Sequence, residues 1–199
     1  ILFDIDHDGD LDAAVARMNF TTPQTTPPAR NVVIYRNDGV GCTCPDGNTG
    51  PFCFAYELTA QGGFDSDSDS FSITAADIDA DGDYDLLQPV LISPDPFGAF
   101  PTMTRIYLND GTGQLGQTDH SPNACIGDGD DTQPPGFFNH RSTEASVWDV
   151  DHDGDYDVVT GHVTNDRVWL NDSSGGAVPT FTLADDFPSV IAPVNDNTR

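Results

Sequence analysis

The 199-residue sequence contains no lysine, only two glutamates, and no apolar run that approaches the ~20 residues of a membrane-spanning helix. Its seven basic residues are all arginine, whereas 33 acidic residues give a formal net charge of −26. A nucleic acid or an anionic membrane surface would repel such a chain, so we expect no nucleic-acid partner and no membrane insertion. A solubilising surface would mix Asp with Glu and Lys, so the bias toward Asp indicates tight loops or metal ligation.

An acidic motif of nine residues recurs three times. It has the form Asp-x-Asp-x-Asp-Gly-Asp-x-Asp, and its copies begin at residues 4, 77 and 149, which are 73 and 72 residues apart. A second motif, Asn-Asp-Gly or Asn-Asp, follows each copy and begins at Asn37, Asn109 and Asn171. Two motifs in the same order, three times, define an internal repeat.

Short apolar segments around each acidic loop predict strands rather than helices. Unbroken apolar runs follow the loops, as expected for strands buried on both faces, and the Asn-Asp-Gly motif is a hairpin signal. Tyr35, Tyr107 and Trp169 share one repeat position, so we expect them, like Trp148, to lie in the core. A fourth strand is predicted at 54–58, at 180–183 and, weakly, around 114–117, whereas residues 119–140 are expected to form a solvated loop.

Four antiparallel strands per repeat describe a blade of a β-propeller. The predicted fold is therefore all-β, a propeller-like array of about three four-stranded blades that is part of a larger propeller or an open assembly. We expect the first blade at residues 1–70, with an insertion at 41–53 stapled by cysteines, the second at 71–142 and the third at 143–199. The 37% hydrophobic content is sufficient for a packed core.

The acidic loops have the composition of calcium sites. Asp at positions 1, 3, 5 and 9 lines one concave side, Gly at position 6 permits the sharp turn, and position 7 can contribute its backbone carbonyl. Six or more oxygen ligands suit Ca²⁺ better than Zn²⁺ or Mg²⁺. An EF-hand is excluded because position 12 is Val15, Gln88 or Thr160 instead of Glu, and the flanking segments are strand-like. Three sites are predicted, formed by Asp4, Asp6, Asp8, Asp10 and Asp12, by Asp77, Asp79, Asp81, Asp83 and Asp85, and by Asp149, Asp151, Asp153, Asp155 and Asp157.

The acidic loops, each followed by an apolar strand and an Asn-Asp turn, resemble FG-GAP/VCBS-type repeats. That family includes the calcium-binding blades of integrin α-chain propellers and related repeats in bacterial surface proteins and lectins. The resemblance covers nearly the whole chain. It implies that positions 1, 3, 5 and 9 of each loop are side-chain calcium ligands and that position 7 is a carbonyl ligand.

Cysteines and sequons indicate an oxidising compartment. Four cysteines allow three pairings, of which we expect Cys44–Cys53 with Cys42–Cys125. Asn19 and Asn171 begin N-glycosylation sequons. Together with calcium loops, these features predict an extracellular protein, secreted or at the cell surface.

No catalytic motif is found in the sequence, which contains neither a Gly-x-Ser-x-Gly elbow nor a His-Glu-x-x-His helix. We therefore expect a non-enzymatic structural or adhesive protein, part of a fibre or cell surface. It would present a recognition or self-assembly surface to other copies of itself or to an extracellular glycan or protein. Two alternatives remain: a lectin-like or polysaccharide-processing propeller module, and a fragment of an integrin-like receptor propeller.

Overall fold

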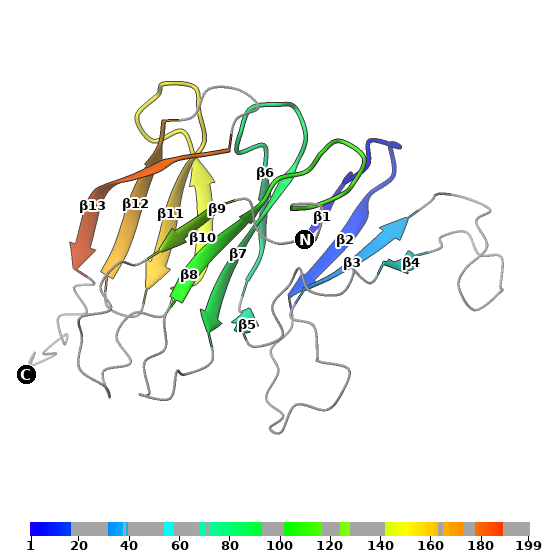
Figure 1. The fold of residues 1–199 in the computed structure, drawn as a ribbon, viewed down its shortest axis with the longest axis horizontal. Coiled ribbons are helices and arrows are strands. Elements are labelled where there is room, and N and C mark those ends of the chain that lie inside the picture. Colours follow the sequence, from blue (N-terminus) through cyan, green and yellow to red (C-terminus); the bar gives the residue numbers. More distant parts are fainter. Residues whose placement is uncertain are drawn as a thin grey trace, which may run out of the picture.

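In the computed structural model, the described part of the chain is all-β, and its strands form three antiparallel sheets (Figure 1). The prediction of an all-β fold is confirmed. No helix that could span a membrane is found within the described residues. The structure describes residues 1–16, 32–37, 39, 54–57, 68–70, 72–92, 102–116, 124–127, 142–162, 165–172 and 178–188.

The first and third sheets each contain four strands in sequence order. The first consists of β1 (Leu2–Phe3), β2 (Asp12–Ala16), β3 (Val32–Asn37) and β4 (Phe54–Glu57). The third consists of β10 (Ser142–Trp148), β11 (Asp157–His162), β12 (Asn165–Asn171) and β13 (Phe181–Pro188).

The second sheet has five strands because its first edge is interrupted. Its members are β5 (Ser68–Ser70), β6 (Thr74–Ala76), β7 (Asp85–Ile92), β8 (Thr102–Tyr107) and β9 (Ala124–Gly127). β5 and β6 both pair with β7, so they act as two parts of one edge strand. β5 lies within the expected first segment, 1–70, and pairs in the second sheet.

The sequence repeat is reproduced in the strand register. The residue after each acidic loop pairs on one side with the strand before the loop and on the other side with an aromatic residue. The three sets are Leu2–Ala13–Tyr35, Ala75–Leu86–Tyr107 and Val147–Val158–Trp169. Each loop therefore enters and leaves its sheet in the same way.

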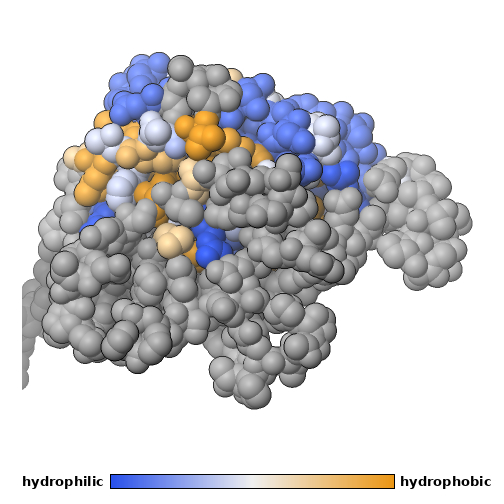
Figure 2. All heavy atoms as spheres, viewed as in Figure 1, coloured by the Kyte–Doolittle hydropathy of each residue, from blue (hydrophilic) through white to orange (hydrophobic). Residues whose placement is uncertain are grey.

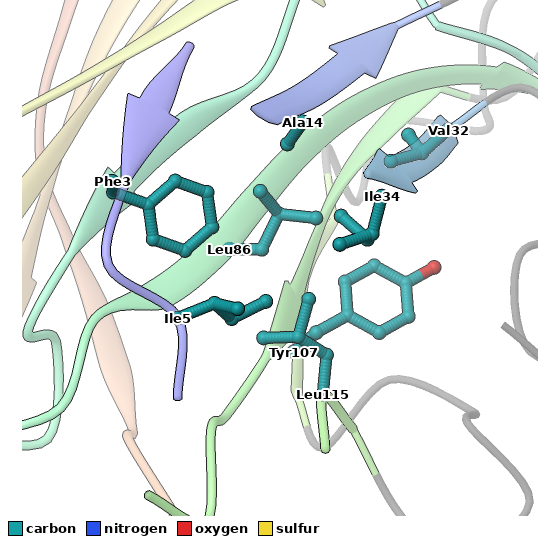
Figure 3. Packing of buried hydrophobic residues seen from close by; sticks show 8 residues of the cluster. All are labelled: Phe3, Ile5, Ala14, Val32, Ile34, Leu86, Tyr107 and Leu115. Atoms are coloured by element: carbon teal, nitrogen blue, oxygen red, sulfur yellow. The ribbon is translucent and has the colours of Figure 1, made fainter. Parts of the chain in front are cut away.

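Two hydrophobic clusters join the sheets in a row. The first lies between the first and second sheets, and Figure 3 shows its side chains pointing toward one another; they are Phe3, Ile5, Ala14, Val32, Ile34, Leu86, Tyr107 and Leu115. The second lies between the second and third sheets and includes Ile78, Leu87, Ile106 and Val158. Successive strand residues face opposite ways, so Leu86 belongs to one cluster and Leu87 to the other. Each fully buried Leu or Ile stabilises the fold by about 1.5–3 kcal/mol.

The sequence predicts the fourth strand of the second sheet around 114–117, but the strand that pairs with β8 is β9, within the segment expected to be a loop. Residues 109–116 instead fold back tightly. Asn109 forms an isolated bridge with Leu115, and the Gly116 N–H donates to the Leu108 carbonyl at 2.8 Å. This turn places Leu115 in the first hydrophobic cluster. The segment that pairs with β8 is β9, which comes later in the chain.

The two tryptophans differ from each other in their surroundings. Trp169 packs against the second hydrophobic cluster, and its indole N–H donates to the Thr160 hydroxyl at 3.1 Å. Trp148 is 67% exposed, so its prediction as a core residue is wrong. The reason is its position on the side of the third sheet that faces away from the second.

Candidate metal centres

The three acidic loops connect β1 to β2, β6 to β7 and β10 to β11, and they lie along one edge of the molecule (Figure 1). Figure 2 shows that this edge is hydrophilic. Their backbones have the same local form. Position 4 has a positive φ in each loop, of 60° at His7, 58° at Ala80 and 64° at His152. The glycine at position 6 also has a positive φ, of about 100°, which L side chains rarely adopt.

The carboxylate at position 9 ties each loop to its sheet. These carboxylates, of Asp12, Asp85 and Asp157, are buried. One oxygen accepts the N–H of loop position 2, and the other accepts the N–H of the asparagine in the Asn-Asp motif. The donor–acceptor distances are 2.8 and 2.7 Å at Asp12, 2.8 and 2.8 Å at Asp85, and 2.6 and 2.9 Å at Asp157. A Glu side chain would displace the carboxylate by one methylene, which explains the preference for Asp here.

Other carboxylates close the loop on itself. At position 5, Asp8, Asp81 and Asp153 each accept the N–H of position 7, at 2.8, 2.9 and 3.0 Å. At position 1, Asp4 and Asp77 each accept the N–H of the glycine at position 6, at 3.1 Å. These hydrogen bonds fix the carboxylates to the backbone of their own loop.

Three carboxylates converge in each loop, with ligand oxygens within 4.8 Å of one another, and each group could hold a metal ion. The groups are Asp4, Asp6 and Asp8; Asp77, Asp79 and Asp85; and Asp149, Asp151 and Asp157. The other predicted ligands lie outside these groups: Asp10 and Asp12, Asp81 and Asp83, and Asp153 and Asp155. Positions 1 and 3 are common to all three groups.

Several oxygens in these groups fit a cation because they are buried and unsatisfied. Within the described residues, no hydrogen-bond donor reaches one oxygen each of Asp4, Asp6, Asp79 and Asp149. A buried carboxylate oxygen without a partner costs free energy unless a cation compensates it. All four oxygens belong to positions 1 or 3, the positions that every group shares. The donor sets are entirely oxygen, as hard divalent cations require.

The pKa values of these aspartates show that burial and neighbouring carboxylates disfavour the ionised form. Burial raises the pKa of Asp85 to about 7, although two backbone N–H donors act in the opposite direction. Burial, together with the charges of Asp81 and Asp77, raises the pKa of Asp79 to about 6. Burial also raises the pKa of Asp12. A divalent cation in the group would favour the ionised form of each carboxylate.

The asparagines of the Asn-Asp motif have a role that the sequence analysis missed. The Asn109 side chain donates to the Ile5 carbonyl of the first loop at 2.7 Å, and the Asn171 side chain donates to the Ile78 carbonyl of the second loop at 2.8 Å. Each asparagine therefore bonds its own sheet to the preceding loop. The recurrence of this asparagine at the end of the third strand of every repeat was the available signal.

Polar side-chain contacts also link the first repeat to the second. The His7 Nε2 atom lies 3.0 Å from an oxygen of Asp83, and the Arg36 guanidinium lies 3.4 Å from Asp6. Arg36 also donates to the Thr112 carbonyl at 2.9 Å. The row of loops is thus held together by polar contacts as well as by the hydrophobic clusters beneath it.

The predicted glycosylation of Asn171 conflicts with its environment. Its side chain is buried and donates to the carbonyls of Ile78 and Tyr156. A glycan on the same nitrogen would displace these hydrogen bonds, and glycosylation of Asn171 stays a prediction. Asn19, Cys42, Cys44 and Cys53 lie outside the described residues; Cys125 lies in β9, and its side chain is not described.

No protein-family model, curated protein or solved structure matches the chain. Function must accordingly be inferred from the three carboxylate groups and the sheets that carry them.

Proposed function

We propose that the protein is a non-enzymatic, extracellular repeat protein in which calcium stabilises a propeller-like array of blades, and that its work is structural or adhesive. One observation carries the proposal: the same carboxylate group, with buried unsatisfied oxygens, recurs three times along one edge. The register of the three sheets and the resemblance of the loops to FG-GAP/VCBS-type repeats support the blade architecture.

Calcium is the cation that this chemistry favours. Positions 1 and 3, joined by position 5 or 9, supply at least three carboxylates to each group. Ca²⁺ tolerates irregular shells of six to eight oxygens, whereas Mg²⁺ demands a near-ideal octahedron and gives up water reluctantly. Dissociation constants of about 0.1–1 mM are typical of extracellular calcium modules, which agrees with the proposed location.

The metal's part in this proposal is structural. The carboxylate at position 9 fixes each loop to the strand ends of its own sheet. The asparagine side chains connect each loop to the sheet of the next repeat. In a metal-free loop, two carboxylates about 4 Å apart repel each other by about 1 kcal/mol even in water. Bound calcium removes this repulsion and fixes the geometry on which contacts between sheets depend.

Calcium stoichiometry tests the proposal directly. We expect isothermal titration of metal-free protein to give three Ca²⁺ per chain, and Asp79→Ala to give two, because Asp79 belongs to the group in the second loop. Asp110→Ala is the matched control. Asp110 is an exposed acid in the turn after β8, outside the three groups, and its removal should leave three bound ions. Absence of calcium binding, or three ions in the Asp79→Ala variant, would contradict the assignment.

The pH dependence of stability should change sign when calcium binds. In metal-free buffer, we expect the melting temperature to rise as the pH falls from about 8 to about 5. The pKa values of about 7 at Asp85 and about 6 at Asp79 lie above the ordinary 3.8, so the folded state takes up protons that the unfolded state does not. The Thr112 hydroxyl lowers the pKa of Asp110, which therefore matters only near and below pH 3.8.

With saturating calcium, the melting temperature should instead fall over the same interval, because protons compete with the metal for the carboxylates. Thermal melts followed by circular dichroism at several pH values measure both slopes. Slopes of the same sign with and without calcium would show that these carboxylates do not hold the ion.

A further inference from the structure

The outer side of the third sheet exposes apolar residues at repeat positions that are buried in the other two sheets. The residue directly before the acidic loop is Phe3 in the first repeat, Ala76 in the second and Trp148 in the third. Phe3 and Ala76 are buried, whereas Trp148 is 67% exposed. A large exposed aromatic side chain at an otherwise buried position indicates a missing neighbour.

The second position of the loop shows the same difference. Ile5 and Ile78 are fully buried, whereas Val150 is 42% exposed. Ile5 is covered by residues of the second sheet, such as Tyr107, and Ile78 by residues of the third, such as Val158. In both cases the cover is the sheet of the next repeat.

The first sheet presents the complementary side at the other end of the row (Figure 1). Ala75 and Val147 occupy one repeat position and pack against the hydrophobic cluster of the preceding sheet, whereas their equivalent, Leu2, is 65% exposed. Tyr35 is only half-buried at the position where Tyr107 is fully buried against the preceding sheet. The first sheet thus offers the residue types that cover a preceding sheet elsewhere in the chain.

Hydrogen-bonding groups at the two ends are also complementary. Asn109 and Asn171 donate to the position-2 carbonyl of the preceding loop at 2.7 and 2.8 Å. No described residue donates to the corresponding carbonyl of the third loop, that of Val150. The Asn37 side chain donates within its own repeat, to the Leu11 carbonyl, at 3.3 Å. If the first sheet of one copy packed against the third sheet of another, the Asn37 side chain could donate to the Val150 carbonyl and repeat this hydrogen bond.

We propose that the outer face of the third sheet binds the outer face of the first sheet in a second copy of this chain, head to tail. The contact continues the sheet-on-sheet packing that already occurs twice within the chain. Such a contact is heterologous, so it generates a ring or an open filament. The inference rests on the proposed function, because Trp148 and Val150 flank or belong to the third calcium loop, and calcium would order it. Calcium and salt would also reduce the repulsion between copies that each carry a formal charge of −26.

Two capping variants test this geometry. Trp148→Glu blocks the third-sheet face and leaves the first-sheet face intact, while Leu2→Glu does the reverse. In about 150 mM salt with calcium, sedimentation velocity should show assemblies for the unmodified chain and monomers for each variant alone. An equimolar mixture of the two variants should form a dimer of twice 21.3 kDa, because only one pair of intact faces remains.

Val178→Glu is the matched control, since Val178 is an exposed apolar residue in the connection between β12 and β13. It should assemble like the unmodified chain, and the melting temperatures of all three variants should stay within about 2 °C of it. A monomeric unmodified chain, or a mixture that fails to dimerise, would overturn the inference. Calcium counted on the same samples separates the two claims. Monomers with three ions overturn only the head-to-tail contact, whereas pairing without bound calcium overturns only the calcium proposal.

Discussion

Removal of calcium should lower the melting temperature of this protein by about 20 °C. At 10 mM calcium and a dissociation constant of about 0.1 mM, one site stabilises the folded state by about 2.7 kcal/mol, so three sites contribute about 8 kcal/mol. In a chain of this size, each kcal/mol corresponds to about 2–4 °C. Thermal melts in calcium and in EDTA, followed by circular dichroism, measure the difference.

Magnesium at the same concentration and ionic strength is the control for general screening of the acidic surface. It should recover only a small part of the difference, because Mg²⁺ dehydrates reluctantly and needs a regular octahedral site. A melt that EDTA leaves unchanged would refute the view that metal stabilises the loops. Equal stabilisation by magnesium would show that screening, rather than a specific site, accounts for the effect.

Asp85→Ala should destabilise the protein even in EDTA, by about 4 kcal/mol in the free energy of unfolding. The Asp85 carboxylate is fully buried and accepts the N–H groups of Ile78 and Asn109, both at 2.8 Å. Its removal leaves two buried donors unsatisfied, at a cost of about 1–3 kcal/mol each. Urea unfolding of the metal-free variant and of the unmodified protein measures the loss without any contribution from calcium.

Asp81→Ala is the control from the same loop. Asp81 is exposed, and its carboxylate accepts the Asp83 N–H within the loop, so its removal in EDTA should change the free energy of unfolding by less than about 1 kcal/mol. Asp85→Asn keeps one acceptor oxygen and should fall between the two alanine variants. Equal losses in Asp81→Ala and Asp85→Ala would mean that the buried carboxylate does not anchor the loop.

The sequence was sufficient to predict the all-β fold and the acidic clusters, because both depend on local pattern. Alternating or unbroken apolar runs specify strands, and Asp-rich loops with a glycine at position 6 specify turns lined with carboxylates. The sequence did not show which three of the five carboxylates in each loop come together in one potential metal site. Position 9 joins the group in the second and third loops, whereas Asp8 takes that place in the first.

Features that depend on distant parts of the chain could not be predicted. The Asn109 side chain bonds to a carbonyl 104 residues away, and that of Asn171 to one 93 residues away. Trp148 has the strand environment of Phe3, and only the absence of a next sheet among the described residues makes it exposed. β9 was missed because the turn around Leu115 fills the place in sequence where the other repeats suggest a strand.

The two bonds made by Asn109 also affect how the three proposed calcium sites would respond to one another. Its backbone N–H binds Asp85 of the second loop, while its side chain binds the Ile5 carbonyl of the first loop. Asn171 joins the second and third loops in the same way. An ion that orders one loop therefore changes the free energy of ordering its neighbour, as in a one-dimensional array with nearest-neighbour coupling. Under the proposed function, the three sites should fill cooperatively, and the protein should stiffen over a narrower range of calcium concentration than three independent sites would allow.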